Sequence, residues 1–400
     1  SSDGSVAIAY FSSGGFDGTS GVFRNPNEIA VVDLKSPASD SNPVLRTLRS
    51  FGAAPDGIVL SPPMVVPGAV DQTPRIFAFV LAQNTVTILD ATHASTREVS
   101  IRLGTDIESG VVHPRELVFA PNTATAYLRS DNADDVLSIV LVGEEADDAS
   151  DNDYQPLLAE LGAGSGPSDV AVYDDASGRR QVLAAMPRRN QLAIIDGDTA
   201  EFVIVSTPDP IDRIMLFPSD SDIPPRFALL ASLSQGLPRL HYLALDNVFD
   251  TLTPIDLRTV NLSEPVLDVI EIPGSDRAMI VHDAERTVLG LLDFAVGAVS
   301  PLEGVGRLDS FDFTRNGETL VGVTSGAKRV GFLDLDSLHP SNLRIDDLPG
   351  KVLTLSNGTI VIDHGDPFGR ATIIPSPSAQ RKDAVVVSGF LLDGYLDDEY

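Results

Sequence analysis

The stretches Val86-Thr-Ile-Leu-Asp90 and Leu192-Ala-Ile-Ile-Asp196 decide the fold, because each alternates apolar side chains over a few residues and ends on an aspartate. Each is too short for a helix and rich in β-branched or aliphatic residues, so it predicts a β-strand. The pattern recurs with its first residues about 49 positions apart on average, which indicates a repeat protein. The eight copies are Ile29–Asp33, Val86–Asp90, Leu137–Leu141, Leu192–Asp196, Leu240–Ala244, Leu289–Asp293, Val330–Asp334 and Ala371–Pro375.

Further strands surround each copy in the same order. Pro114–Pro121 and Pro167–Tyr173 are apolar segments that come two strands before their copies, and Phe202–Val205 is a strand that follows one. Four antiparallel strands per repeat are the blade of a β-propeller. We therefore expect an all-β chain that forms a single β-propeller of eight four-stranded blades. Seven blades are the alternative, if the two terminal repeats share one blade.

The two ends of the chain complement each other. The first repeat begins with the strand Ser5–Tyr10 and lacks an earlier one, whereas Phe390–Tyr395 follows the last complete repeat. We expect this extra strand to complete the N-terminal blade and close the ring, since an open ring would leave an unpaired strand edge. Residues 1–4 then form a flexible tether, and residues 5–400 form the single propeller domain.

The charge balance excludes several kinds of partner. The chain has 28 Lys and Arg against 57 Asp and Glu, for a net charge of -29. Because nucleic-acid affinity depends on cations that neutralise phosphates, no nucleic-acid partner is expected. Anionic membrane surfaces are disfavoured for the same reason. No apolar run is long enough for a transmembrane helix, so direct membrane insertion of this sequence is not expected.

The absence of Cys excludes disulfides, thiolate metal sites and Cys nucleophiles. The opening Ser1-Ser2-Asp3-Gly4-Ser5 is typical of a tether that remains after removal of a signal sequence. We expect a bacterial protein that is exported to the periplasm, outer surface or medium, with a lipoprotein tether as one form of attachment.

The phrase Asn84-Thr-Val-Thr-Ile-Leu-Asp90 and its counterpart Asn190-Gln-Leu-Ala-Ile-Ile-Asp196 resemble the blades of YVTN-type propellers. These belong to the lactonase-like and quinoprotein-like propeller families. The resemblance covers most of the chain and implies the propeller architecture. Quinone-cofactor chemistry usually uses Trp and often a Cys pair, both of which this chain lacks, and the lactonase cleft of His, Arg and acidic residues has no matching motif here.

Charged residues gather by pattern at the entry to the first strand of several repeats. In a propeller these loops line the mouth of the central channel, so the side chains converge there and predict a polar binding site. The alternative is a solvated channel mouth without a ligand. The residues of this predicted site are His113, Arg115, Glu116, Asp169, Asp212, Arg213, Asp268 and Asp309.

The aspartates that end the repeat strands have a structural interpretation. We expect their side chains to accept backbone N–H bonds in the following turn. A separate acidic loop, residues 144–153, offers Ca²⁺ oxygen ligands at Asp147, Asp148, Asp151 and Asp153. It lacks the glycine and closing glutamate of an EF-hand, so the pattern favours a solvated loop over a Ca²⁺ site. No other cofactor is expected.

Three functions remain open. The first is a non-enzymatic exported or surface-associated scaffold that binds a protein or glycan partner through its loops. The second is a lactonase-like hydrolase or lyase with its site at the channel mouth, and the third is a structural subunit of a cell-surface assembly. Missing catalytic motifs favour the first, whereas fold likeness does not choose among them. The oligomeric state does not follow from the sequence.

Overall fold

The computed structural model of the chain describes residues 1, 4–10, 27–34, 44–49, 54–106, 110–145, 152–218, 223–246, 248–249, 255–283, 288–302, 308–366 and 369–389. The chain divides into two compact units, Ser1–Ile214 and Met215–Tyr400. Apart from three short 3-10 turns, the regular structure in these ranges is all β, as predicted. None of the described helical turns is long and apolar enough to cross a membrane.

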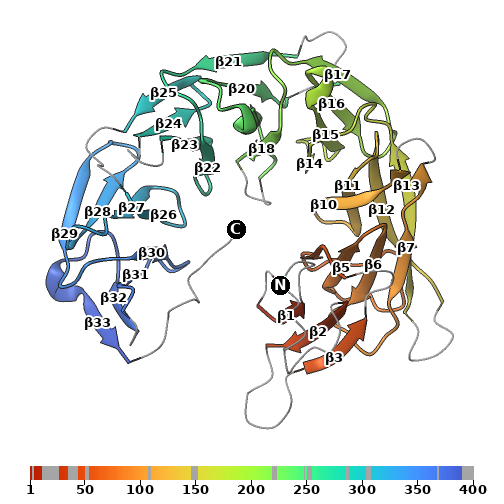
Figure 1. Cartoon of the computed structure of the whole chain (residues 1–400), viewed down its shortest axis with the longest axis horizontal. Helices are drawn as coiled ribbons and strands as arrows, with labels where there is room; N and C mark the ends of the chain where they lie inside the picture. The colour runs from red at the N-terminus through yellow and green to blue at the C-terminus, as the bar shows by residue number, and fades with distance from the viewer. Residues whose placement is uncertain are drawn as a thin grey trace. The chain divides into compact units, whose positions relative to one another are not determined.

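In the first unit, consecutive strands pair antiparallel to form one three-stranded sheet and three four-stranded sheets (Figure 1). A two-stranded hairpin, β8 and β9, lies between the second and third of these sheets in sequence and was not predicted. The strands are β1 (Val6–Tyr10), β2 (Glu28–Asp33), β3 (Val44–Arg49), β4 (Gly57–Leu60), β5 (Phe77–Ala82), β6 (Thr85–Asp90), β7 (Val99–Arg102), β8 (Thr105–Asp106), β9 (Gly110–Val111), β10 (His113–Phe119), β11 (Thr125–Asp131), β12 (Val136–Gly143), β13 (Tyr154–Leu161), β14 (Asp169–Asp174), β15 (Arg180–Met186), β16 (Gln191–Asp196) and β17 (Phe202–Ser206).

The second unit repeats this arrangement in four four-stranded sheets, the first of which begins with a strand that crosses the boundary between the units. Its strands are β18 (Arg213–Phe217), β19 (Phe227–Ala231), β20 (Arg239–Ala244), β21 (Leu257–Asn261), β22 (Asp268–Glu271), β23 (Arg277–Asp283), β24 (Val288–Asp293), β25 (Ala298–Pro301), β26 (Ser310–Phe313), β27 (Thr319–Val323), β28 (Arg329–Asp334), β29 (Pro340–Arg344), β30 (Lys351–Thr354), β31 (Ile360–Asp363), β32 (Arg370–Ile374) and β33 (Val385–Ser388).

These sheets are the blades of a β-propeller. Each is a meander of consecutive strands, and the first strands of successive sheets lie next to each other, as β10 does with β14 and β26 with β30. The eight sheets agree with the eight predicted blades, and the first described sheet lacks a preceding strand, as expected. The predicted closing strand Phe390–Tyr395 lies outside the described residues. The assignment of residues 5–400 to a single domain, with residues 1–4 as a tether, stays a prediction.

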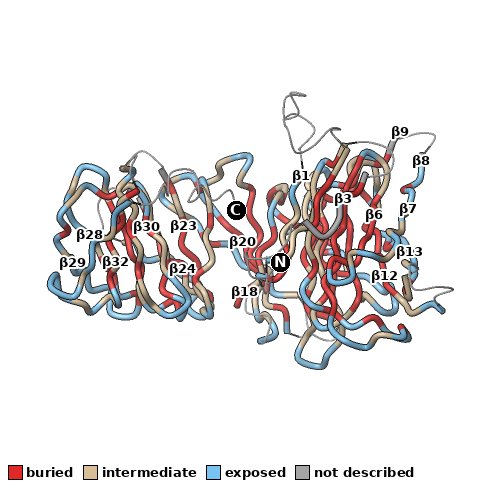
Figure 2. Tube along the Cα trace, turned by 90° about the horizontal axis from the view of Figure 1, so that it is seen from below, coloured by how far each residue is buried: buried red, intermediate tan, exposed pale blue. Residues whose placement is uncertain are grey.

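The core lies between the faces of successive sheets. All six residues of β5 are buried, because this central strand packs on both sides, whereas the outer strand β7 alternates between half-buried and exposed positions. The side chains of β5 and β6 pack against Leu117 and Leu128 of the next sheet. Figure 2 shows the same gradient, with buried central strands and exposed outer ones. This packing positions the first strands of successive blades side by side, where charged residues from different blades can meet.

The repeated aspartates perform the predicted turn role. The Oδ1 atoms of Asp90, Asp196, Asp293 and Asp334 each accept hydrogen bonds from the backbone N–H groups two and three residues later. A short carboxylate at the end of a strand satisfies N–H groups that the turn leaves unpaired. The prediction is confirmed at these four positions.

Candidate functional site

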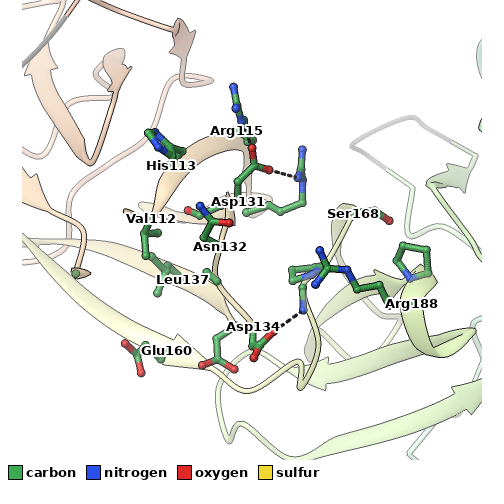
Figure 3. Close-up of a pocket in the computed structure, with 18 of the residues that line it drawn as sticks. Val112, His113, Arg115, Asp131, Asn132, Asp134, Leu137, Glu160, Ser168 and Arg188 are labelled. Carbon is green, nitrogen blue, oxygen red and sulfur yellow. Dashed lines mark hydrogen bonds and ion pairs between the residues drawn. The ribbon is translucent and has the colours of Figure 1, made fainter. Parts of the chain in front are cut away.

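A cavity of about 1220 Å³ opens in the first unit, at the end of the sheets where the chain enters β10 and β14. The β11–β12 hairpin and the 3-10 turn η1 (Pro187–Arg189) border it as well, because in a four-stranded meander these turns lie at the same end as the entry to the first strand. Its wall is dominated by charged and small residues (Figure 3). A site for a small apolar ligand would instead be lined mainly by hydrophobic and aromatic side chains.

A β-bulge shapes one wall of the cavity. The register of β10 against β11 shifts between Pro114 and Glu116, so no residue of β11 stands directly opposite Arg115 in the strand pairing. Such a bulge bends the strand and redirects the extra side chain. Arg115 lines the cavity, and its Nε lies 2.5 Å from Oδ2 of Asp131.

The same ionic network continues inward from Asp131. Arg129 stands directly opposite Glu116 in the β10–β11 register, and its Nε donates to Oε2 of Glu116 over 3.1 Å. Its Nη1 lies 3.7 Å from Oδ1 of Asp131. Opposite charges at facing positions of two strands attract each other. Arg129 therefore connects a charge on the cavity wall to Glu116 on the first strand of the blade.

Glu116 meets a second carboxyl group, Asp169, at the equivalent position of the next blade. Oδ2 of Asp169 also accepts a hydrogen bond from the backbone N–H of Ile214. Burial, and after it the negative charge of Glu116, raises the pKa of Asp169 to about 7, although the Ile214 N–H favours the ionised form. Two carboxyl groups in contact share one proton, because both cannot ionise without repulsion.

Other charged groups of the cavity carry no internal partner. Asp135, Glu160 and Arg188 line it and make no hydrogen bond or ion pair with any described residue. Figure 3 shows Glu160 with Asp134 on one side of the cavity and His113 with Arg115 on the other. Asp134 is engaged, since its Oδ1 accepts the N–H of Gly166. The two unpaired carboxylates, Asp135 and Glu160, thus add uncompensated negative charge to the cavity wall.

A buried hydroxyl group borders the same cavity. Ser130 is 2% exposed, and its Oγ has no hydrogen-bond partner among the described residues. A buried polar group without a partner costs free energy. A ligand or water that supplied a hydrogen bond there would recover that cost.

The structure brings four of the predicted site residues together: His113, Arg115, Glu116 and Asp169. Asp212 lies just before β18, and Arg213 begins that strand and is exposed. Asp268 and Asp309 belong to the second unit. The first accepts the N–H of Val269, and the second accepts the N–H and hydroxyl of Ser325. Convergence of all eight residues at one channel mouth stays a prediction.

The predicted Ca²⁺ ligands are described only at Asp153, because Asp147, Asp148 and Asp151 lie outside the described residues. The Asp153 Oδ1 accepts from Arg75 at 2.6 Å and its Oδ2 from the N–H of Asp71. Although burial opposes them, these hydrogen bonds lower the pKa of Asp153. The described part of the chain has no group of three or more residues arranged to hold a metal. The solvated acidic loop stays the prediction and a Ca²⁺ site its alternative, which a rise in the unfolding midpoint on adding Ca²⁺ after chelation would support.

Sequence reasoning missed the cavity residues of the β11–β12 hairpin, Arg129 to Asp135, and also missed Glu160 and Arg188. A usable signal was present, because the meander places each hairpin between second and third strands beside the entry to the first strand. The register pairs His113 with Asp131 accordingly. The dense charges of Arg129-Ser-Asp-Asn-Ala-Asp-Asp135 could therefore have been assigned to the same end of the blade as His113.

Comparisons with known proteins found similar solved structures but no matching family model or curated protein. The solved structure of dihydro-heme d1 dehydrogenase NirN in complex with DHE is similar at 14% identity and a TM-score of 0.48, covering 96% of this chain and 78% of that one. Hydrazine synthase of Kuenenia stuttgartiensis matches at 14% identity and a TM-score of 0.41, covering 82% and 96%. Hsv2 of Kluyveromyces lactis matches at 10% identity and a TM-score of 0.43, covering 78% and 94%.

The class defined by these observations is an all-β propeller repeat protein with a polar cavity in its N-terminal unit. Sequence identities of 10 to 14% transfer no residue role to this chain. Its function must be inferred from its own side chains.

Proposed function

We propose that this protein is a non-enzymatic, exported β-propeller of the YVTN-like kind that binds a protein partner through the cavity beside β10 and β14. The observation that carries the proposal is the set of charged side chains on the cavity wall that have no partner among the residues that the structure describes. Asp135 and Glu160 remain available for a cation, and Arg188 for an anion. Charges of this kind give specificity to an interface when a partner supplies the opposite charge.

The class of partner follows from the lining and from the net charge. No Phe, Tyr or Trp is among the described residues that line the cavity, so a sugar would find no large aromatic surface there on which to stack. A chain with a net charge of -29 attracts cationic partners over long range and repels anionic ones. Both observations favour a basic segment of a protein partner over a glycan.

Binding of short peptides tests this proposal. We expect a hexalysine peptide to bind in low salt, and a hexaglutamate peptide or a neutral oligosaccharide not to bind, by fluorescence anisotropy. The double variant Asp135→Asn/Glu160→Gln should weaken hexalysine binding about tenfold, since each partly exposed charge contributes about 0.5 to 1 kcal/mol.

A matched control removes the same charge elsewhere. Asp246→Asn/Glu318→Gln changes two exposed carboxylates of the second unit and should alter affinity by less than about twofold. Equal losses in both double variants would mean that hexalysine responds only to net charge. That result, or tight binding of the oligosaccharide, would contradict the proposal.

A second candidate is a lactonase-like hydrolase or lyase, which the Glu116–Asp169 pair favours. A carboxyl group with a pKa of about 7 is suited to general acid–base chemistry near neutral pH. Hydrolysis of a panel of lactones, followed by acid release, tests this candidate. Activity that is lost in both His113→Ala and Glu116→Ala would establish it in place of the scaffold.

A further inference from the structure

The partly exposed carboxyl pair, Glu116 and Asp169, is connected to the cavity by a continuous series of ionic contacts. Glu116 touches Asp169 on one side and Arg129 on the other. Arg129 reaches Asp131, and Asp131 holds Arg115. Arg115, Arg129 and Asp131 all line the cavity. A change in the charge of the Glu116–Asp169 pair therefore alters the electrostatic interactions of Arg129 with the side chains of the cavity wall.

We propose that Glu116 and Asp169 form a proton-carrying pair that sets the charge of the cavity wall through Arg129, so that a basic segment binds more tightly once the pair has lost its shared proton. This inference rests on the proposed function, because the ligand it concerns is the basic segment of a partner in that cavity. Glu116 and Asp169 act here as positioning residues, since their effect passes through Arg129.

The groups that face the pair explain why it holds a proton. From β10 Glu116 faces Asp169 directly, and from β11 the guanidinium of Arg129 faces Glu116. From β18 the backbone N–H of Ile214 donates a hydrogen bond to the Asp169 carboxyl. A single guanidinium is thus shared between Glu116 and Asp131, and no cationic side chain of the described residues forms an ion pair with Asp169 itself. With one proton, the pair carries one negative charge, which Arg129 balances.

Loss of that proton adds one uncompensated negative charge behind Arg129. The extra charge attracts Arg129 more strongly and weakens its hold on Asp131, which is already its longer contact at 3.7 Å. Asp131 keeps its contact with Arg115 at 2.5 Å but is compensated by one guanidinium instead of two, so the net charge of the cavity wall around Asp135 and Glu160 becomes more negative. Affinity for a cation rises, and by linkage the bound cation drives the pair to release its proton.

Another blade of the same chain makes the equivalent contact with a side chain that does not titrate. Ser310, at the start of β26, stands where Asp169 stands at the start of β14. Its Oγ accepts the N–H of Val352 on the next blade at 3.1 Å, as Asp169 accepts the N–H of Ile214. Asp169→Ser therefore keeps an acceptor for the bridge between blades and removes the titrating group.

The test measures the affinity for hexalysine between about pH 6 and pH 8 at constant low ionic strength. We expect the wild-type affinity to rise about fivefold over this range, a typical effect of one charge at a partly solvated site. In Asp169→Ser the affinity should change less than about twofold over the same range. Calorimetry at neutral pH in two buffers with different ionisation enthalpies should show proton release on binding to the wild type and not to Asp169→Ser.

His113 lines the same cavity and is a titratable side chain, so His113→Gln is measured in parallel and should retain the rise. A rise that persists in Asp169→Ser, or disappears in His113→Gln, would overturn the inference. Wild-type binding that does not depend on pH would overturn it while leaving the proposed function intact. Failure of hexalysine to bind at any pH would overturn both.

Discussion

Asp90 and Asp334 occupy the same position of the repeat but differ in their surroundings. Each ends the third strand of its blade, and the Oδ1 of each accepts the backbone N–H groups two and three residues later. Asp90 is 2% exposed and forms an ion pair with Arg75, whereas Asp334 is exposed. The hydrogen bonds of the turn therefore depend on the aspartate and its local sequence alone. The buried ion pair of Asp90 depends in addition on a tertiary contact within the first unit.

Arg75 makes this addition possible. It is 3% exposed, and its Nη1 reaches both Asp90 at 3.3 Å and Asp153 at 2.6 Å. Its guanidinium also lies over the rings of Phe77 and Tyr154, with the carbon 5.4 and 5.9 Å from the two centroids. One cation therefore compensates two carboxylates and packs against two aromatic rings, so its removal affects more than one contact.

The largest expected effect is that of Arg75→Leu. The variant leaves Asp90 and Asp153 without a guanidinium, although Asp90 keeps its contact with His93 at 3.1 Å, and loss of one partner from a buried ion pair costs about 3 to 5 kcal/mol. Urea unfolding of the whole chain measures this change. The control Arg277→Leu removes an arginine that is paired with the exposed Asp336 and should cost about 1 kcal/mol or less. Equal costs would show that burial of Arg75 adds nothing.

A smaller effect is expected at Gly143, where the backbone that leads to Asp153 crosses another segment. A Cβ at this position would lie 1.9 Å from the carbonyl carbon of Gly68, and the Gly143 N–H donates to Pro67 over 2.7 Å. Gly143→Ala should therefore lower stability by about 1 to 3 kcal/mol, as overpacking does. In the second unit a Cβ at Gly326 meets nothing within 4 Å. Gly326→Ala should leave the urea midpoint unchanged, and a fall as large as that of Gly143→Ala would contradict the steric explanation.

The difference between Asp90 and Asp334 also shows how far the sequence predicts the molecule. Strands and aspartate turns follow from periodicity over a few residues, so they could be predicted. The Arg75–Asp153 pair joins residues 78 positions apart with no pattern between them, and it could not. Glu116 and Asp169 lie between these cases, because the repeat places equivalent positions of successive first strands side by side. The charge state of their pair depends on burial, which the sequence does not show.

The third effect is a pH dependence of stability that Asp169 causes. We expect it to shift the unfolding midpoint by a few degrees. Its folded-state pKa of about 7 lies above the ordinary aspartate pKa of 3.8, so between these values the folded state binds more protons than the unfolded state. Stability contributed by this group therefore falls as the pH rises from about 4 to about 7. We expect the wild-type unfolding midpoint to fall about 3 °C more than that of Asp169→Ser between about pH 5 and pH 8. Parallel curves for the two proteins would show that Asp169 titrates as an ordinary carboxyl group.

The smallest effect is expected for Asp334→Ala, which removes the turn role without a buried pair. The variant loses the bonds that Asp334 accepts from the N–H and hydroxyl of Ser337, both 2.7 Å long. The hydrogen bond from the backbone N–H of Ser337, and after it the one from the Ser337 hydroxyl, lowers the pKa of Asp334. A lowered folded-state pKa contributes stability that is present above the unfolded value and is lost as the pH falls through the folded one.

We therefore expect Asp334→Ala to lower the unfolding midpoint at neutral pH by about 2 °C, and the difference from wild type to shrink below about pH 4. Asp336→Ala removes an exposed carboxylate of the same turn and should have less effect, because its side chain makes only the exposed ion pair with Arg277 and its backbone N–H, which the turn uses, is kept. An effect of Asp334→Ala as large as that of Arg75→Leu would mean that the turn, and not the buried ion pair, is what stabilises each repeat.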